Sequence, residues 1–288
     1  MYKNPFSLLK TSLYALSTHP AILFPFGLLA FIQLLILEIL YFAPRYPLAI
    51  FFGPIIRRLA GESYMHYPQN FVLLQKWFAE SWIQIPVYIL FYSVGIGMAV
   101  LIISDINSQR KVRLPEIFKR TFAVYAHLMV AAGVTVGILY GFSVLYGLVM
   151  QRALQIRSIS GIYFYIKMAV IYGAPLFQLL FSGIVTAALA FVIPLIMLEK
   201  RNVFSALWLN FRRYGRDLFT IFLVVFLSGL IYVPILLLKY FQQWYQAVRI
   251  PELLGVVAVL GVIVLFFVDA IQVTAITTYY LLDQETRE

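Results

Sequence analysis

The 288-residue sequence contains no cysteine and few charged residues. The lack of cysteine excludes disulfide bonds, thiolate nucleophiles and sulfur-ligated metals. Charged residues make up 12% of the chain, against roughly 25% in a soluble domain. So few charges cannot cover a surface that faces water, and the mean hydropathy of +0.89 points the same way. The composition therefore predicts an integral membrane protein.

The sequence also lacks the motifs of the common catalytic and cofactor sites. It has no HExxH metal motif, no GxSxG nucleophile elbow and no phosphate-binding loop. The three histidines, His19, His66 and His127, are too far apart in the chain to predict a metal cluster. The first 20 residues have no small-x-small cleavage site, so we do not expect a cleaved signal peptide. We therefore expect no enzyme activity, no metal and no cofactor.

Six apolar stretches are long enough to cross a bilayer, which takes about 20 residues of helix. They cover residues 21–43, 82–104, 122–150, 174–198, 218–238 and 253–282. A shorter apolar segment, Ile162–Tyr172, contains Lys167. We interpret it as an interfacial helix that leads into the fourth span or as the start of one long kinked helix. A seventh span is the less favoured alternative. The long segment 44–76 is expected to hold an interfacial or re-entrant helix over residues 48–56.

Three short amphipathic segments precede the first, third and fifth spans. Their apolar stripes, spaced by three and four residues, are Phe6, Leu9, Leu13 and Leu16; Leu114, Phe118, Phe122 and Tyr125; and Phe204, Leu207, Phe211 and Tyr214. Such spacing is typical of one helix face, and such helices lie in the membrane interface. The order amphipathic helix, span, span thus occurs three times, over residues 1–104, 105–198 and 199–288. We predict an all-α, single-domain membrane protein of six transmembrane helices over residues 1–288, arranged as three hairpins that each follow an interfacial helix.

The net charge of +10 is spread among the loops that flank the spans. We interpret these positive charges as setting the membrane topology and binding anionic lipid headgroups, and not as binding nucleic acid. The candidate headgroup-binding residues are Arg110, Lys111, Arg113, Lys119, Arg120, Arg212, Arg213 and Arg216. Placing the amphipathic segments and both termini on one side puts 13 of the 22 Lys and Arg residues there. The positive-inside rule then predicts a multi-pass protein of the cell inner membrane with both termini in the cytoplasm.

A few polar residues fall inside or beside the predicted spans. Ionisable groups at such positions are costly and indicate functional sites, and the candidates are Asp269, Glu38 and His127. A carboxyl group in hydrocarbon either takes up a proton or finds a partner, so Asp269 and Glu38 could form a proton or cation site or join two helices. Four glutamines, Gln33, Gln84, Gln178 and Gln272, are expected to form interhelical hydrogen bonds. Helix breaks are predicted at residues 173–175, Gly183 and Pro194 in the fourth span, and at Gly229 with Pro234 in the fifth. The small residues Gly95 and Gly97 predict close helix packing.

The third block carries a pattern of short motifs. Pro194 is followed by Glu199, then by Ala206-Leu207 and Asn210, and the sequence then runs through Arg212 to the next span. The second block has Asp105 and Leu114-Pro115-Glu116-Ile117-Phe118, and the chain ends with Tyr279-Tyr280-Leu281-Leu282-Asp283. The pattern resembles the bacterial and archaeal membrane-protein group that includes the membrane domain fused to glycerophosphodiester phosphodiesterases. In that group a serine usually occupies the position of Asn210. The resemblance implies a six-helix membrane domain without the catalytic domain of the fused relatives.

Two functions follow as hypotheses. The first is a non-enzymatic membrane scaffold, lipid-interacting protein or subunit of a membrane complex, with anionic lipids and a protein partner or a second copy as partners. The alternative is a small transporter or channel with a proton or cation site at Asp269 and Glu38. An intramembrane enzyme would need a polar pocket with at least two catalytic groups, which the sequence does not predict. The two main hypotheses differ in whether Asp269 faces a cavity or a packed interface.

Overall fold

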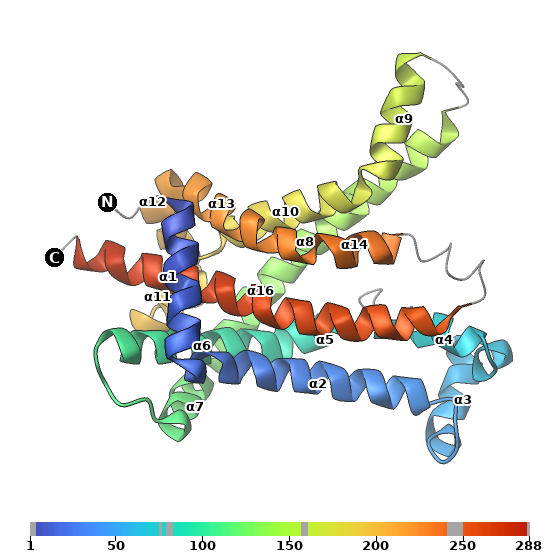
Figure 1. Ribbon diagram of the computed structural model, residues 1–288, viewed down its shortest axis with the longest axis horizontal. Helices are drawn as coiled ribbons and strands as arrows, with labels where there is room; N and C mark the ends of the chain where they lie inside the picture. Colours follow the sequence, from blue (N-terminus) through green and yellow to red (C-terminus); the bar gives the residue numbers. More distant parts are fainter. Residues whose placement is uncertain (1–3, 75–76, 79–82, 157–160, 241–249, 287–288) are drawn as a thin grey trace.

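The computed structural model describes residues 4–74, 77–78, 83–156, 161–240 and 250–286, with the side chains of positions 214 and 216 excepted. Every regular element in these ranges is helical, as predicted. Six helical stretches are long and apolar enough to cross a membrane, namely Pro20–Phe42, Gln84–Asn107, Tyr125–Gln155, Ala174–Leu198, Leu218–Tyr240 and Glu252–Glu285. They confirm the six predicted spans, and the fourth has the predicted bounds. The chain thus has the architecture of a multi-pass membrane protein (Figure 1).

Four of the six spans consist of more than one helical segment. The first is η1 (Pro20–Ile22) with α2 (Leu23–Phe42), and the second is α5 (Gln84–Val87), a π-helical turn η4 (Tyr88–Tyr92) and α6 (Ser93–Asn107). The fourth is α10 (Ala174–Ala188) with α11 (Val192–Leu198), and the fifth is α13 (Leu218–Gly229), η6 (Leu230–Tyr232) and α14 (Val233–Tyr240). The third and sixth are single helices, α8 (Tyr125–Gln155) and α16 (Glu252–Glu285).

The second, fourth and sixth spans form the inside of the bundle. Their apolar windows are 61%, 50% and 44% buried, against 28%, 17% and 33% for the first, third and fifth. The main core cluster joins these inner spans through fully buried side chains such as Ile102, Leu195 and Tyr280. The outer spans are apolar but largely exposed, which is the pattern expected of helices that contact lipid.

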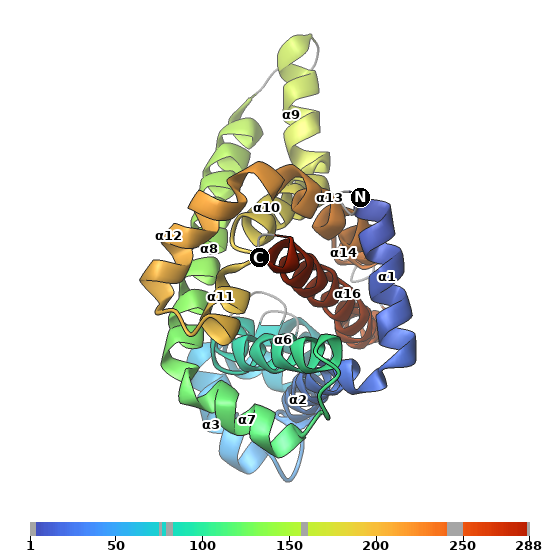
Figure 2. The same cartoon turned by 90° about the vertical axis from the view of Figure 1, so that its left-hand side faces the viewer.

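The amphipathic segments form three helices, α1 (Pro5–Thr18), α7 (Leu114–Ala123) and α12 (Val203–Tyr214). α7 packs against α6, α12 packs against α11, and α1 packs against α16 and α13. Figures 1 and 2 show all three at the same end of the bundle as both chain termini. α7 and α12 therefore each pack against the span that precedes them in the chain, and α1 packs against the last two spans.

The three helices bury similar pairs of residues. One turn separates a buried apolar residue from a buried hydroxyl or amide in each, in the pairs Leu8 and Ser12, Ile117 and Thr121, and Ala206 and Asn210. Large aromatic side chains on the same helices are exposed, among them Phe6, Phe118 and Trp208. The face that contacts the protein is therefore small and partly polar, and the aromatic residues lie outside it.

The opposite end of the bundle carries α3 (Ala49–Leu59), η2 (Glu62–Met65) and α4 (Gln69–Leu74), as Figure 1 shows. The helix predicted over residues 48–56 is present as α3. α9 (Ile162–Tyr172) packs against α8, and its last turn is closed by a hydrogen bond from Gly173 N–H to the Ala169 carbonyl. It is a helix of 11 residues, too short to span by itself, and Gly173 alone separates it from α10, at the break predicted for residues 173–175. Figure 1 shows it projecting from the bundle with the end of α8.

Close packing of α6 depends on its glycines, as predicted. A Cβ atom at Gly97 would lie 3.1 Å from both Leu128 Cδ1 and Thr121 Cγ2, and 3.3 Å from Met197 Sδ. These three atoms belong to α8, α7 and α11, so α6 is enclosed at this point from three directions. A side chain at Gly97 cannot be accommodated by the movement of one neighbour alone.

We expect Gly97→Leu to lower the free energy of unfolding by about 1–3 kcal/mol, because overpacking strains a closed core. Thermal unfolding of the purified protein in detergent measures this. Gly141→Leu on α8 is the matched control, since a Cβ at Gly141 meets no atom within 4 Å. Equal unfolding temperatures for the two variants would contradict the packing argument.

A candidate binding cavity between the inner spans

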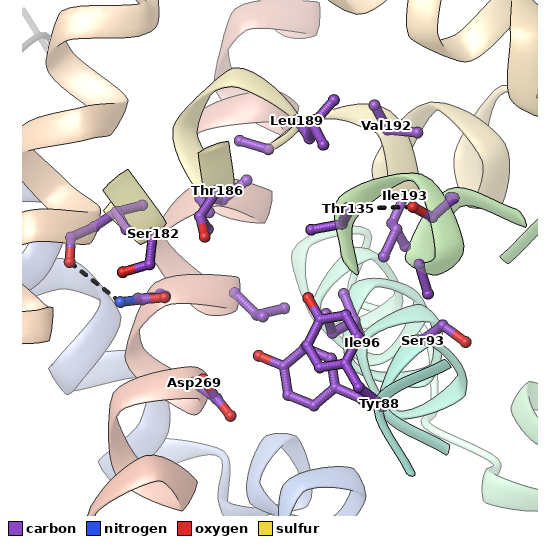
Figure 3. Close-up of a pocket in the computed structure, with 18 of the residues that line it drawn as sticks. Tyr88, Ser93, Ile96, Thr135, Ser182, Thr186, Leu189, Val192, Ile193 and Asp269 are labelled. Carbon is purple, nitrogen blue, oxygen red and sulfur yellow. Dashed lines mark hydrogen bonds between the residues drawn. The ribbon is translucent and has the colours of Figure 1, made fainter. Parts of the chain in front are cut away.

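A cavity of about 270 Å³ lies between the three inner spans (Figure 3). α8, α12 and the fifth span complete its wall. Each inner span contributes polar side chains, namely Tyr88, Tyr92 and Ser93 from the second, Ser182 and Thr186 from the fourth, and Asp269, Gln272 and Thr277 from the sixth. The rest of the lining is mainly aliphatic. The site is thus an apolar cavity with a few polar groups, which is the usual form of a small-molecule site.

The second span brings two tyrosines to the cavity through a π-helical turn. The turn covers Tyr88–Tyr92, and the rings of Tyr88 and Tyr92 stack with centroids 4.4 Å apart and planes 21° apart. The wider turn of a π-helix changes the direction in which side chains leave the helix, and such turns are frequent at functional sites. Tyrosines near the end of a span are typical of the aromatic belt at the membrane surface. In the structure both line the cavity.

The fourth span breaks at residues 189–191, between α10 and α11. Pro194 lies in the first turn of α11 and has no N–H to donate to the carbonyl four residues earlier, at Ala190. Residues on both sides of the break, among them Leu189, Ala190 and Val192, line the cavity. The predicted break at Pro194 is confirmed, whereas Gly183 lies inside the continuous helix α10.

Asn210 of α12 supplies the hydrogen bonds that the broken helix lacks. Its Nδ2 donates to the Ala188 carbonyl at 2.6 Å, and its Oδ1 accepts from the Phe191 N–H at 3.2 Å. An unpaired backbone group in hydrocarbon costs several kcal/mol, so a break at this depth needs such a partner. The side chain is only 3% exposed. The amide of Asn210 thereby ties α12 to the cavity wall.

The sixth span carries the ionisable group of the site. Asp269 keeps part of its surface accessible, and Figure 3 shows it beside the cavity with Tyr88 nearby. The hydroxyl group of Tyr92 interacts with the Asp269 carboxyl group. Gln272 donates from Nε2 to the Val225 carbonyl at 3.1 Å, which is an interhelical hydrogen bond of the predicted kind. The buried Thr277 hydroxyl, further along the same wall, has no hydrogen-bond partner among the described residues.

The fifth span adds a residue pair at the edge of the cavity. The predicted break at Gly229 and Pro234 is present as η6, and Tyr232 of this turn lines the cavity. Lys239 Nζ donates to the Tyr232 hydroxyl at 2.7 Å. Lys239 was not among the intramembrane candidates because the predicted span ended at Leu238. In the structure the span continues through Tyr240.

The three intramembrane candidates do not lie at one site. Asp269 lines the cavity, but Glu38 on α2 and His127 at the start of α8 are exposed and do not belong to its described lining. Asp269 and Glu38 therefore do not share a site in this conformation. The carboxyl group of Asp269 meets tyrosines of the second span instead. The i, i+4 spacing of Tyr88 and Tyr92 was the signal in the sequence that could have indicated this contact.

An acidic residue at the end of the second span, and another at the end of the fourth, each meet a basic residue of the helix that follows, α7 or α12. Glu199 accepts a hydrogen bond from Arg213 Nη1 at 2.7 Å, and Asp105 lies 3.8 Å from Arg120. Glu199 also accepts from the Tyr280 hydroxyl at 2.9 Å, which links α16 to this group. Burial raises the pKa of Glu199, but the hydrogen bond from Tyr280 and the charge of Arg213 outweigh it, so its pKa lies below the usual value.

The candidate headgroup-binding residues fall into three groups. Arg113, Arg120 and Arg213 form ion pairs with Glu116, Asp105 and Glu199. Four are exposed and form no ion pair within the described ranges, namely Arg110, Lys111, Lys119 and Arg212. The side chain of Arg216 lies outside the described part. The four exposed cations are available to an external anion.

Comparisons of the chain with protein-family models, with curated proteins and with solved structures found no match.

We expect Glu199→Gln to lower the free energy of unfolding by about 1.5–3 kcal/mol near neutral pH, because it weakens hydrogen bonds to a charged group. The pKa of this carboxyl is lowered by folding, so its contribution is complete above the unfolded value of about 4.3 and is lost as pH falls through the folded value. The wild type and the variant should therefore converge in thermal stability under acid.

Glu116→Gln is the control, since Glu116 is an exposed partner of Arg113 and surface pairs contribute about 0–1 kcal/mol. Thermal unfolding over a pH series measures both variants. A stability gap for Glu199→Gln that does not shrink at low pH would refute the assignment.

Proposed function

We propose that this chain is a non-enzymatic membrane protein that binds a small solute in the cavity and moves it across the membrane, with Asp269 as its proton- or cation-binding group. The observation that carries the proposal is the position of Asp269. Its carboxyl group faces a cavity between the inner spans, opposite a break in the fourth span. This favours the transport hypothesis over that of a scaffold alone.

Two physical arguments support the proposal. An ionisable residue inside a membrane is costly, and those that face an internal cavity mark pathways for ions and substrates. Helices that are broken at membrane depth place backbone groups and side chains around a site, as in many transporters. Here the breaks of the fourth and fifth spans both border the same cavity as Asp269. A carboxyl group that served only to join two helices would not need this accessible surface.

We also propose three hairpins that each follow an interfacial helix, with both termini in the cytoplasm of a cell whose inner membrane holds the protein. The packing of α7 on α6, α12 on α11 and α1 on α16 supports the repeat. The excess of Lys and Arg at the end that carries the termini supports the orientation. The resemblance to the six-helix membrane-domain group stays a proposal, supported by the hydrogen bond between its motif residues Glu199 and Tyr280.

Asp269→Asn should abolish pH-driven flux in proteoliposomes, because an amide cannot exchange a proton or neutralise a cation. A pH-sensitive dye inside the vesicles measures the response to an imposed pH gradient. Glu38→Gln is the matched control, as it removes a carboxyl from another span but outside the described cavity lining, and it should retain the flux. Wild-type flux in Asp269→Asn, or no flux in the wild type, would remove the proposal.

A second function, binding of anionic lipid at the end that carries the termini, is favoured by the surfaces of α7 and α12. α12 exposes Phe204, Trp208 and Phe211 together with Arg212, and α7 exposes Phe118 with Lys119. Aromatic residues beside cations suit the headgroup region of a membrane. This activity is compatible with transport, because it uses a different part of the molecule.

The double variant Arg212→Glu with Lys119→Glu should retain less anionic lipid in native mass spectrometry, since each cation near an anionic surface contributes about 1 kcal/mol. Arg213 is left unchanged because it holds Glu199. The control is Arg58→Glu, an exposed cation on α3 at the other end. Equal lipid retention by the double variant and the control would argue against this surface.

A further inference from the structure

We propose that the solute of the cavity is an organic cation, namely a protonated amine attached to a small apolar or aromatic body. The inference rests on the proposed function and adds the chemical class of the substrate. Three properties of the cavity carry it: the sign of its charge, the aromatic faces beside that charge, and its size.

The described lining residues include one carboxyl group, that of Asp269, and no lysine, arginine or histidine. Lys239 is the nearest basic residue in the fifth span, and its Nζ is directed at the Tyr232 hydroxyl. An anionic ligand would thus meet a carboxyl group in a wall whose described lining residues carry no positive charge. A cationic ligand would neutralise the carboxylate inside a region of low dielectric constant, where the attraction is strongest.

The stacked rings of Tyr88 and Tyr92 lie next to Asp269. Aromatic faces attract ammonium groups, by about 0.5–2 kcal/mol depending on how far the pair is removed from water. An ammonium group bound at Asp269 would therefore have a carboxylate on one side and aromatic rings on the other. Figure 3 shows Tyr88 and Asp269 on the same side of the cavity, where both can contact one bound group.

The cavity volume of about 270 Å³ favours an organic cation over a bare ion as the ligand. It lies near the lower end of the range for small-molecule pockets, which is about 300–1,000 Å³. Most of the wall is aliphatic, including Ile96, Leu139, Leu179, Ile193 and Val268. Metal ions such as Ca²⁺ take about 6–8 oxygen ligands, whereas the described lining supplies one carboxyl group among mainly aliphatic residues. The wall fits the apolar body of an amine.

Besides Asp269, Thr277 is a polar residue of the cavity wall that a ligand could bind. Its buried hydroxyl has no partner in the described part of the protein. It lies eight residues after Asp269, which is about 12 Å along a helix. A ligand with an ammonium group at Asp269 and a hydroxyl or amide group at its other end would satisfy both positions.

Three probes of similar shape test the proposal, namely phenethylamine, 2-phenylethanol and phenylacetate. They are cationic, neutral and anionic near neutral pH. Isothermal titration calorimetry of the protein in nanodiscs measures their binding. We expect the amine to bind at least about tenfold more tightly than the other two, a difference of about 1.4 kcal/mol.

Variants separate binding in the cavity from partitioning into lipid. Asp269→Asn should remove the preference for the amine, and Glu38→Gln should keep it. Tyr88→Leu should weaken amine binding by about 2- to 30-fold, in line with the loss of one cation–π contact. Tyr88→Leu keeps Asp269, so it tests the site even if Asp269→Asn does not fold.

The outcomes distinguish the substrate class from the proposed function. Equal binding of the three probes, tighter binding of phenylacetate, or an unchanged preference in Asp269→Asn would overturn the substrate class. Heat from sodium chloride alone that depends on Asp269, without amine binding, would replace the organic cation by an inorganic one. If Asp269-dependent flux persists while no amine binds, the substrate class is wrong and the transport function stands. If flux and binding are both absent, both proposals are overturned.

Discussion

The two hydrogen bonds of Asn210 are the interaction on which the interior of this protein depends. A membrane helix normally satisfies all of its own backbone groups, and a break at depth exposes groups that lipid cannot bind. The fourth span breaks beside Pro194, and Asn210 binds both sides of the break, at the Ala188 carbonyl and the Phe191 N–H. The chain can therefore leave the helical path at this point, and residues at the break form part of the cavity wall. A helix at the end of the bundle thus makes the cavity possible.

The same helix connects the cavity to the membrane surface. α12 exposes aromatic side chains on one face, while its other face carries Asn210 and the ion pair of Arg213 with Glu199. Glu199 in turn accepts a hydrogen bond from Tyr280, on the helix that carries Asp269. A displacement of α12 would therefore act on two walls of the cavity together, through the fourth span and through α16. The hydrogen-bonded break and the partly buried ion pair resist small, independent movements, so we expect these parts to move as a unit.

The sequence was sufficient to predict features that are summed over many residues or fixed by local chemistry. The six spans follow from hydropathy over about 20 residues each, and the break at Pro194 follows from its missing N–H. Other features depend on tertiary contacts. The π-helical turn that brings Tyr88 and Tyr92 to the cavity has no local signature, and tyrosines near a span end are equally typical of the membrane surface. Glu38 and Asp269 also look alike in sequence, because a helix that is apolar all round does not reveal which side faces the interior.

The proposed repeat explains where the chemistry lies. The acid and base pairs Asp105 with Arg120 and Glu199 with Arg213 lie at the ends of the second and fourth spans. The inner spans differ from one another in the residues that line the cavity. The second supplies tyrosines, the fourth supplies hydroxyl groups beside a break, and the sixth supplies a carboxyl group. Three identical inner spans would bring three carboxyl groups together, and their mutual repulsion would favour protonation or a multivalent ion. One carboxyl group among aromatic and aliphatic neighbours favours a single positive charge on an apolar body. The asymmetry between the repeats, rather than the repeat itself, therefore determines what the cavity can bind.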